Sequence, residues 1–348
     1  MISMKPIFSA TLVNGVWGDP CLCIDLRFQR RAILFDIGDV SALSTQVLLR
    51  ISEIFVSHTH MDHFAGFDHL LRVCLGRDTG IRMFGPPGFV SQVEHKLAAY
   101  TWDLLPNYAT AFTVEAHELH EGGLLRRARF RSSARFQREP LPEVAVTDGV
   151  LLAEDQFRVR AAAFAHHRIV SLGFSFDEDV HINVWKNRLD EKGLPSGPWL
   201  SQLKALARQG AAEDTPVPVR WRTREGHREQ TFTLGELKRD VLEFVPGQRV
   251  CYVTDVNGDP LNRERICEFV RGADILFIEA VFAQADHELA ARKSHLTTLQ
   301  SGSIARLAGV RHAQPFHFSA RYRDGEEAHH GEFLQAWQGT SHLGRADV

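Results

Sequence analysis

The chain has 348 residues, of which 44% are hydrophobic and 24% charged, enough for a large core in one or two domains and ordinary for a water-soluble protein. The formal net charge of −3 argues against a nucleic-acid binder with a globally basic surface, although it leaves room for local basic patches. Neither a stretch of roughly 18 apolar residues for a membrane span nor a secretion signal is found. An odd number of cysteines without a framework spacing predicts reduced thiols and a cytoplasmic location.

The first part of the chain predicts strands that alternate with helices. Strands are expected at 21–28, 31–38, 54–57 and 81–85, the first two as a pair. Helices are expected at 64–76 and 89–105. The motif HTHMDH, residues 58–63, therefore lies on a loop between the end of a strand and the start of a helix.

The remainder is predicted to be β-rich at first and to return to alternation after an interruption. Residues 110–166 read as mostly β, and 157–167 form one clear strand. Residues 181–245 break this rhythm and look like a loop or an arm inserted into a single domain, 1–348. Further strands are expected at 249–255, 273–282 and 312–322, with helices at 263–272 and 296–310.

The histidines and carboxylates at these strand ends predict a metal site. In an extended loop His58 and His60 point the same way and can share one metal, while Asp62 and His63 can hold a second. Two ions need further ligands, including a bridging carboxylate. Asp255, His317 and the pair His166-His167 each stand where a strand stops. Any one of them could be a surface or turn residue, so the prediction rests on their joint occurrence.

This order of ligands resembles the metallo-β-lactamase superfamily, in which Asp36 of ILFDIGD would support the HTHMDH loop. The resemblance implies an αββα sandwich of the metallo-β-lactamase type with an inserted arm. Within the superfamily, HHRIVSLGF, FIEAVF, SHLTTLQSGSIARLAGV and HFSARY are similar to segments of the ribonuclease Z family. The ligand histidine of that family lies six residues before a glycine, which favours His167 over His166 here. The metal ligands implied are His58, His60, Asp62, His63, His167, Asp255 and His317.

The resemblance also implies the chemistry. Two divalent ions, most simply zinc, although manganese or iron would accept the same ligands, would activate a water molecule for attack on phosphorus. Asp62 would hold one metal and orient that water. His295 would give a proton to the leaving 3′ oxygen, with Glu279 orienting it, although His295 could instead cap a helix.

An anionic substrate needs cationic contacts. Residues 126–138 hold six arginines and no acid, and Arg127, Arg129 and Arg131 would share one strand face, either against RNA phosphates or as the wet face of a hairpin. In the segment 181–245, which resembles the tRNA-gripping arm of the family, Gly197, Pro198 and Lys204 are weaker candidates for substrate binding. Arg321 in HFSARY is another.

The function implied is that of a ribonuclease Z-like homodimer that cuts RNA on the 3′ side of tRNA precursors. Departures from the family concern substrate placement: its N-terminal Pro-Thr-x-x-Arg-Asn stretch is missing, GDVSAL follows the first aspartate, and His295 precedes Leu-Thr. One alternative is therefore a small-molecule phosphodiesterase or another hydrolase of the lactonase or thioesterase type. Another is a non-catalytic RNA-binding scaffold, which the complete ligand set disfavours.

Overall fold

The computed structural model describes residues 7–27, 29–223 and 226–339, which group into two compact units. Unit 1 contains the described residues up to Ala153, Arg158–Asp177, and the described residues from Gln248 onward. Unit 2 contains Glu154–Phe157 and Glu178–Gly247. The predicted arm, 181–245, falls within unit 2.

The first sheet of unit 1 follows the order of the chain. Its strands are β1 (Phe8–Leu12), β2 (Leu22–Leu26), β3 (Arg31–Phe35), β4 (Ile51–Phe55), β5 (Gly80–Gly85), β6 (Thr113–His120), β7 (Leu124–Arg131) and β8 (Arg138–Ala145). The pairs β3–β4, β4–β5 and β5–β6 are parallel, whereas neighbouring strands from β1 to β3 and from β6 to β8 pair antiparallel. The predicted strand pair is β2 with β3, in which Leu22 faces Phe35.

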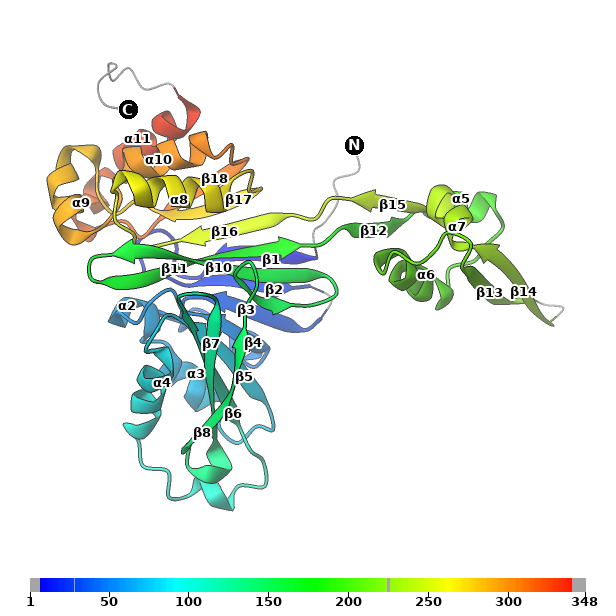
Figure 1. Ribbon diagram of the computed structural model, residues 1–348, viewed down its shortest axis with the longest axis horizontal. Helices are drawn as coiled ribbons and strands as arrows, with labels where there is room; N and C mark the ends of the chain where they lie inside the picture. The colour runs from blue at the N-terminus through cyan, green and yellow to red at the C-terminus, as the bar shows by residue number, and fades with distance from the viewer. Residues whose placement is uncertain (1–6, 28, 224–225, 340–348) are drawn as a thin grey trace. The chain divides into compact units, whose positions relative to one another are not determined.

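Helices cover the outer face of this sheet (Figure 1). They are α1 (Thr45–Leu48), α2 (Met61–Phe64), α3 (Phe67–Cys74) and α4 (Phe89–Ala98), with 3-10 turns at Leu105–Asn107 and Ser132–Ala134. Phe67, Leu71 and Cys74 of α3 are buried in the same core as Ile54 of β4. Helix α4 ends earlier than predicted, and the indole of Trp102 donates a hydrogen bond of 2.7 Å back to the carbonyl of Leu97 at the helix end.

The second sheet has the order β18-β17-β16-β11-β10-β9. Its strands are β9 (Val150–Ala153), β10 (Phe157–His166), β11 (Ile169–Glu178), β16 (Arg249–Val253), β17 (Ile275–Glu279) and β18 (His312–Phe316). The strands β16, β17 and β18 are parallel, whereas β11 and β16 are antiparallel. Its outer helices are α8 (Pro260–Val270), α9 (His287–Lys293), α10 (Thr298–Leu307) and α11 (Glu326–Gln338), with 3-10 turns at Gln284–Asp286 and Ala320–Gly325.

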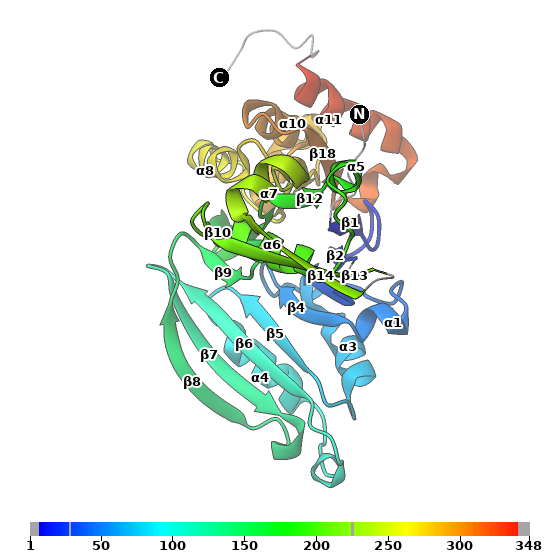
Figure 2. The same cartoon turned by 90° about the vertical axis from the view of Figure 1, so that its right-hand side faces the viewer.

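Aromatic rings join the inner faces of the two sheets. The ring centroid of Phe174 lies 5.3 Å from that of Phe35 and 5.7 Å from that of Phe55, and the ring of Tyr252 lies 5.9 Å from Phe35. All four side chains are fully buried, and burying a ring of this size is worth about 1.5–3 kcal/mol. With helices outside both sheets, unit 1 is the αββα sandwich that the sequence predicts (Figures 1 and 2).

Unit 2 is an ordered body with its own core. It consists of the pair β12 (His181–Val184) and β15 (Leu242–Val245), the hairpin β13 (Pro216–Thr223) and β14 (Gly226–Thr233), and the helices α5 (Lys186–Glu191), α6 (Trp199–Arg208) and α7 (Leu234–Val241). Leu189, Leu203, Val219 and Leu237 are among the side chains buried together there. The prediction of a loop or an arm therefore understated the local structure, because these apolar residues are spread thinly among polar ones.

No helix in the described ranges combines the length and apolar character that crossing a bilayer requires. The thiols of Cys21, Cys23, Cys74, Cys251 and Cys267 are free.

Candidate metal centre

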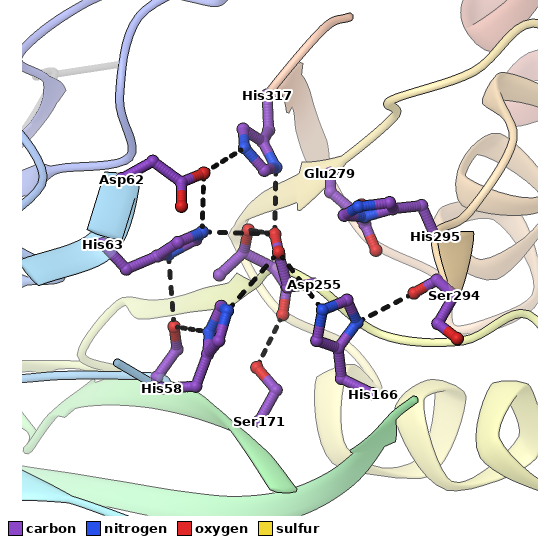
Figure 3. A network of polar contacts seen from close by, with 12 residues as sticks. His58, Asp62, His63, His166, Ser171, Asp255, Glu279, Ser294, His295 and His317 are labelled. Carbon is purple, nitrogen blue, oxygen red and sulfur yellow. Dashed lines mark hydrogen bonds and ion pairs between the residues drawn. The ribbon is translucent and has the colours of Figure 1, made fainter. Parts of the chain in front are cut away.

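The candidate ligands gather where strands of both sheets end (Figure 3). His58, Asp62 and His63 follow β4, whereas Asp255 and His317 follow the parallel strands β16 and β18. Carboxyl ends of parallel strands meet at one edge of a sheet, which is where such folds bind ligands. Asp255 (φ 48°) and His317 (φ 59°) have left-handed backbone conformations that turn the chain away from its strand. Such strained conformations in non-glycine residues are often found at functional sites.

Asp255 joins two groups of side chains through its two carboxylate oxygens. Its Oδ1 lies 2.9 Å from Nδ1 of His317 and 3.4 Å from Nε2 of His63. Its Oδ2 lies 3.5 Å from Nε2 of His58 and 3.6 Å from Nε2 of His166. In the groups His58–His60–His166–Asp255 and Asp62–His63–His317, the possible ligand atoms lie within 4.8 Å of one another. A carboxylate that offers one oxygen to each of two groups has the arrangement needed of a bridge between two cations.

Asp36 supports this loop from behind. Its Oδ1 accepts the backbone N–H of Ser57 at 2.6 Å, and its Oδ2 accepts the Ser57 hydroxyl at 2.9 Å and Nδ1–H of His63 at 2.8 Å. Because a carboxylate only accepts, His63 is the donor, and its Nε2 faces the cluster. Gly38 lets this segment come close, since a Cβ there would collide with the carbonyl oxygen of Asp62.

The buried histidine nitrogens and the carboxylates of the cluster are suited to binding metal ions. Nε2 of both His58 and His63 is buried and has no hydrogen-bond partner within the described part of the chain. Burial lowers the pKa of His58 to about 2 and also lowers that of His166, so both imidazoles are neutral, as ligands must be. Burial disfavours charge on His317 as well, yet Asp255 and Asp62 raise its pKa to about 10. The carboxylates therefore attract positive charge here, and imidazole nitrogens with carboxylate oxygens are the donors that zinc takes.

Of the two adjacent histidines at the end of β10, the one that faces the candidate metal centre is His166, not His167. His166 is the last residue of β10 and is buried, and its Nδ1 lies 2.9 Å from the carbonyl oxygen of Ser294. His167 is exposed, and its φ of 50° places it in the turn to β11. The prediction of His167 is corrected by this geometry: along β10 the buried positions Phe164 and His166 alternate with Ala165, and the turn begins before His167.

The predicted acid, His295, lies beside the cluster. Its ring centroid is 5.2 Å from that of His166 and 5.9 Å from that of His317. The fully buried Glu279 holds it: Oε2 lies 2.8 Å from Nδ1 of His295, while Oε1 accepts the N–H of Val256, next to Asp255, at 2.8 Å. Burial opposes protonation of His295, but Glu279 raises its pKa above the usual value.

The arginines of β7 are paired with carboxylates from neighbouring strands. Arg129 lies 2.7 Å from Glu115 on β6, and Arg131 lies 2.7 Å from Glu139 on β8. Nε of Arg127 donates to the carbonyl of Pro142 at 2.9 Å. These contacts favour the hairpin interpretation of residues 126–138 over the RNA-binding one, because the acids missing from that segment come from the adjacent strands.

The remaining substrate candidates are divided between the two units. Gly197 and the exposed Pro198 precede helix α6 of unit 2, and Lys204 is half-buried on that helix. In unit 1, Arg321 lies 3.4 Å from Asp286.

Two residues near the cluster were missed in the sequence. The carbonyl of Ser294 (φ 59°) receives the hydrogen bond of His166. The hydroxyl of Tyr252 donates to Oδ2 of Asp36 at 2.8 Å. Of the two, only the hydrogen bond of Tyr252 could have been expected from the sequence, because the hydroxyl of a tyrosine inside a buried strand needs a hydrogen-bond partner.

Comparisons with known proteins agree with this fold. No family model matches the chain. "Ribonuclease Z" of Deinococcus radiodurans is 29% identical over 347 residues, which cover 97% of this chain and 95% of that protein. Yeast PDE1 matches at a TM-score of 0.54 with 9% identity, covering 94% of this chain and 93% of that one. The metallo-beta-lactamase fold protein YhfI from Bacillus subtilis matches at a TM-score of 0.50 with 13% identity, covering 90% and 87%. The chain thus has the metallo-β-lactamase fold, and it resembles the ribonucleases Z along nearly its whole length.

Proposed function

We propose that the protein is a metal-dependent endoribonuclease of the ribonuclease Z type, which hydrolyses the phosphodiester on the 3′ side of tRNA precursors. The observation that carries this proposal is Asp255, which directs one oxygen toward each of two ligand groups in a chain that resembles ribonucleases Z over 97% of its length.

His58, His60 and His166 would hold one cation, Asp62, His63 and His317 the other, and Asp255 both. When bound, two divalent ions lower the pKa of bound water and neutralise charge on the phosphoryl group. Zinc suits these donors best, while manganese or iron would accept them.

The chain's own groups divide the remaining work. The carboxylate of Asp62 is 42% exposed, so it can accept a hydrogen bond from the attacking water. His295, protonated and held at Nδ1 by Glu279, has Nε2 free of that contact and can give its proton to the leaving 3′ oxygen. The pairing with Glu279 raises the pKa of His295 against the effect of burial, which favours the acid form that this role needs.

The test is a comparison of substrates and variants. Wild-type protein of measured metal content is given a 3′-extended tRNA precursor, a chromogenic phosphodiester and a thioester. Asp255→Ala should lose bound metal and hydrolysis together, whereas Asp103→Ala, at an exposed position of unit 1, should keep both. Full metal content and full turnover in Asp255→Ala would refute the bridging role.

A small-molecule phosphodiesterase or a lactonase or thioesterase is the second candidate. The pairing of Arg129 and Arg131 with glutamates favours it, because it removes cations that a large RNA could use. Cleavage of the chromogenic ester without cleavage of the precursor would decide for it.

We further propose that the protein is a cytoplasmic homodimer in which unit 2 grips the RNA, as the family resemblance implies. Light scattering of the purified protein and binding of the precursor to variants of unit 2 test these points.

A further inference from the structure

We propose that the hydroxyl of Tyr252 is a positioning group of the metal centre, because it fixes Asp36 and, through Asp36, the ligand His63. This inference rests on the metal centre proposed above. It concerns a residue of the second sheet that is not itself one of the candidate ligands.

Asp36 receives donors from two directions. Ser57 and His63 approach it from the segment after β4 of the first sheet, and Asp36 itself directly follows β3 of that sheet. Tyr252 lies on β16 of the second sheet, and its hydroxyl donates to Oδ2 of Asp36 at 2.8 Å. This oxygen thus sits between the imidazole of His63 and the phenol of Tyr252.

The hydroxyl can only act as a donor in this contact. Tyr252 and Asp36 are both fully buried. Burial, together with the carboxylate of Asp36, raises the pKa of Tyr252 well above its usual value, so the phenol stays neutral. A buried carboxylate without its full set of donors is costly and tends to reorient.

Reorientation of Asp36 would reach the metal centre directly. Its hydrogen bond to Nδ1 of His63 keeps the proton on that nitrogen and leaves Nε2 for a cation. Tyr252 also lies on β16, three residues before Asp255, which follows the end of that strand. The contact therefore ties the strand that carries the bridging carboxylate to the support of a ligand from the other sheet.

The variant Tyr252→Phe removes the hydroxyl and keeps the ring packed against Phe35 and Phe316. Zinc is titrated into metal-free protein against a chromophoric chelator. We expect one of two binding steps to weaken about tenfold, in the range typical for lost supporting contacts. Ser132→Ala is the matched control: it removes a buried hydroxyl that accepts the N–H of Phe112 at 2.9 Å, and zinc affinity should not change.

A double-variant cycle identifies the route. If Tyr252 acts through Asp36, Tyr252→Phe should not weaken zinc binding further in protein that already carries Asp36→Asn. Equal zinc affinity of Tyr252→Phe and wild type, or full additivity with Asp36→Asn, would overturn the inference. Wild-type protein that binds no zinc would instead overturn the metal centre itself.

Wild-type protein offers a readout that does not depend on how the variant folds. The buried hydroxyl proton of Tyr252 should exchange slowly with water and give a proton NMR resonance, and its position should move when zinc binds. A resonance that zinc leaves unchanged would contradict the coupling to His63.

Discussion

Two adjacent histidines, His166 and His167, have different surroundings, and only one of them faces the candidate metal centre. His166 is buried and directs Nε2 toward Asp255, whereas His167 is exposed in the turn between β10 and β11. Because the two residues are adjacent in the sequence, substitution of His167 is a matched control for substitution of His166.

His166→Ala should lower the zinc stoichiometry and reduce phosphodiester hydrolysis by a factor of a hundred or more, on the order of the cost of removing a group that polarises the reacting bond. His167→Ala should retain both to within about twofold, because an exposed turn residue contributes little. Metal analysis and steady-state kinetics check this, and the reverse result would restore the assignment of His167.

Glu279→Gln should move the pH dependence of RNA cleavage. Glu279 raises the pKa of His295 against the effect of burial, so the required protonated form persists to higher pH and is lost as pH rises through that pKa. With a neutral glutamine the burial effect remains, the pKa falls, and the decline in rate should begin at lower pH. The measurement is kcat against pH for the precursor.

The chromogenic phosphodiester serves as the internal control for Glu279→Gln, since its weakly basic leaving group needs little help from an acid. An equal displacement of both pH profiles would show that His295 is not the proton donor.

Most of the candidate ligands that the structure brings together were expected from the sequence, because each is a polar residue shortly after an apolar strand. The hydrophobic periodicity of the flanking strand and helix was enough to place His58, Asp62 and His63 between these two elements. The choice between His166 and His167 could not be made this way, because it depends on where a turn begins. The contact of Tyr252 with Asp36 joins two sheets and leaves no trace in local spacing.

Strand β7 illustrates the same limit at the scale of elements. Its arginines recur along one strand face in the sequence, but whether they pair with acidic side chains or remain available for RNA depends on which strands lie beside them. Glu115 of β6 and Glu139 of β8 supply the opposite charges. Such pairing across strands stabilises a sheet by about 0.2–1 kcal/mol for each pair.

The double variant Arg129→Gln, Arg131→Gln should lower the free energy of unfolding by about 1 kcal/mol and leave RNA affinity unchanged. Urea unfolding and filter binding at several salt concentrations provide the two measurements. A smaller salt dependence of RNA binding in this variant would show that the arginines contact phosphates after all. Lys204→Gln in unit 2 is the comparison, for which weaker binding is expected.

Unit 2 enters the chain between two neighbouring strands of the second sheet. Asp177 of β11 faces Arg249 of β16 in an antiparallel pair, so the chain leaves and re-enters unit 1 at adjacent points. Both units have cores of their own. At the scale of the whole molecule, all the candidate metal ligands belong to unit 1, so we expect the metal centre to form without unit 2.

Replacement of residues 178–248 by Asn-Gly, which would join the paired Asp177 and Arg249 through a two-residue hairpin turn, should therefore leave a folded protein. It should retain its zinc and its hydrolysis of the chromogenic phosphodiester, while its affinity for the tRNA precursor falls at least tenfold. Metal analysis and kinetics with both substrates check this. Unchanged precursor cleavage would remove unit 2 from substrate recognition.

Asp36, Asp255 and His317 must each turn the backbone into the left-handed region and also present a side chain to the centre or its support. Glycine would satisfy the first demand and fail the second, and alanine would fail both. Asparagine tolerates that backbone shape and keeps the outline of aspartate. Exchanging the two aspartates for asparagine therefore removes the negative charge and retains the left-handed backbone conformation. Substitution by alanine would change both at once, so the two effects could not be told apart.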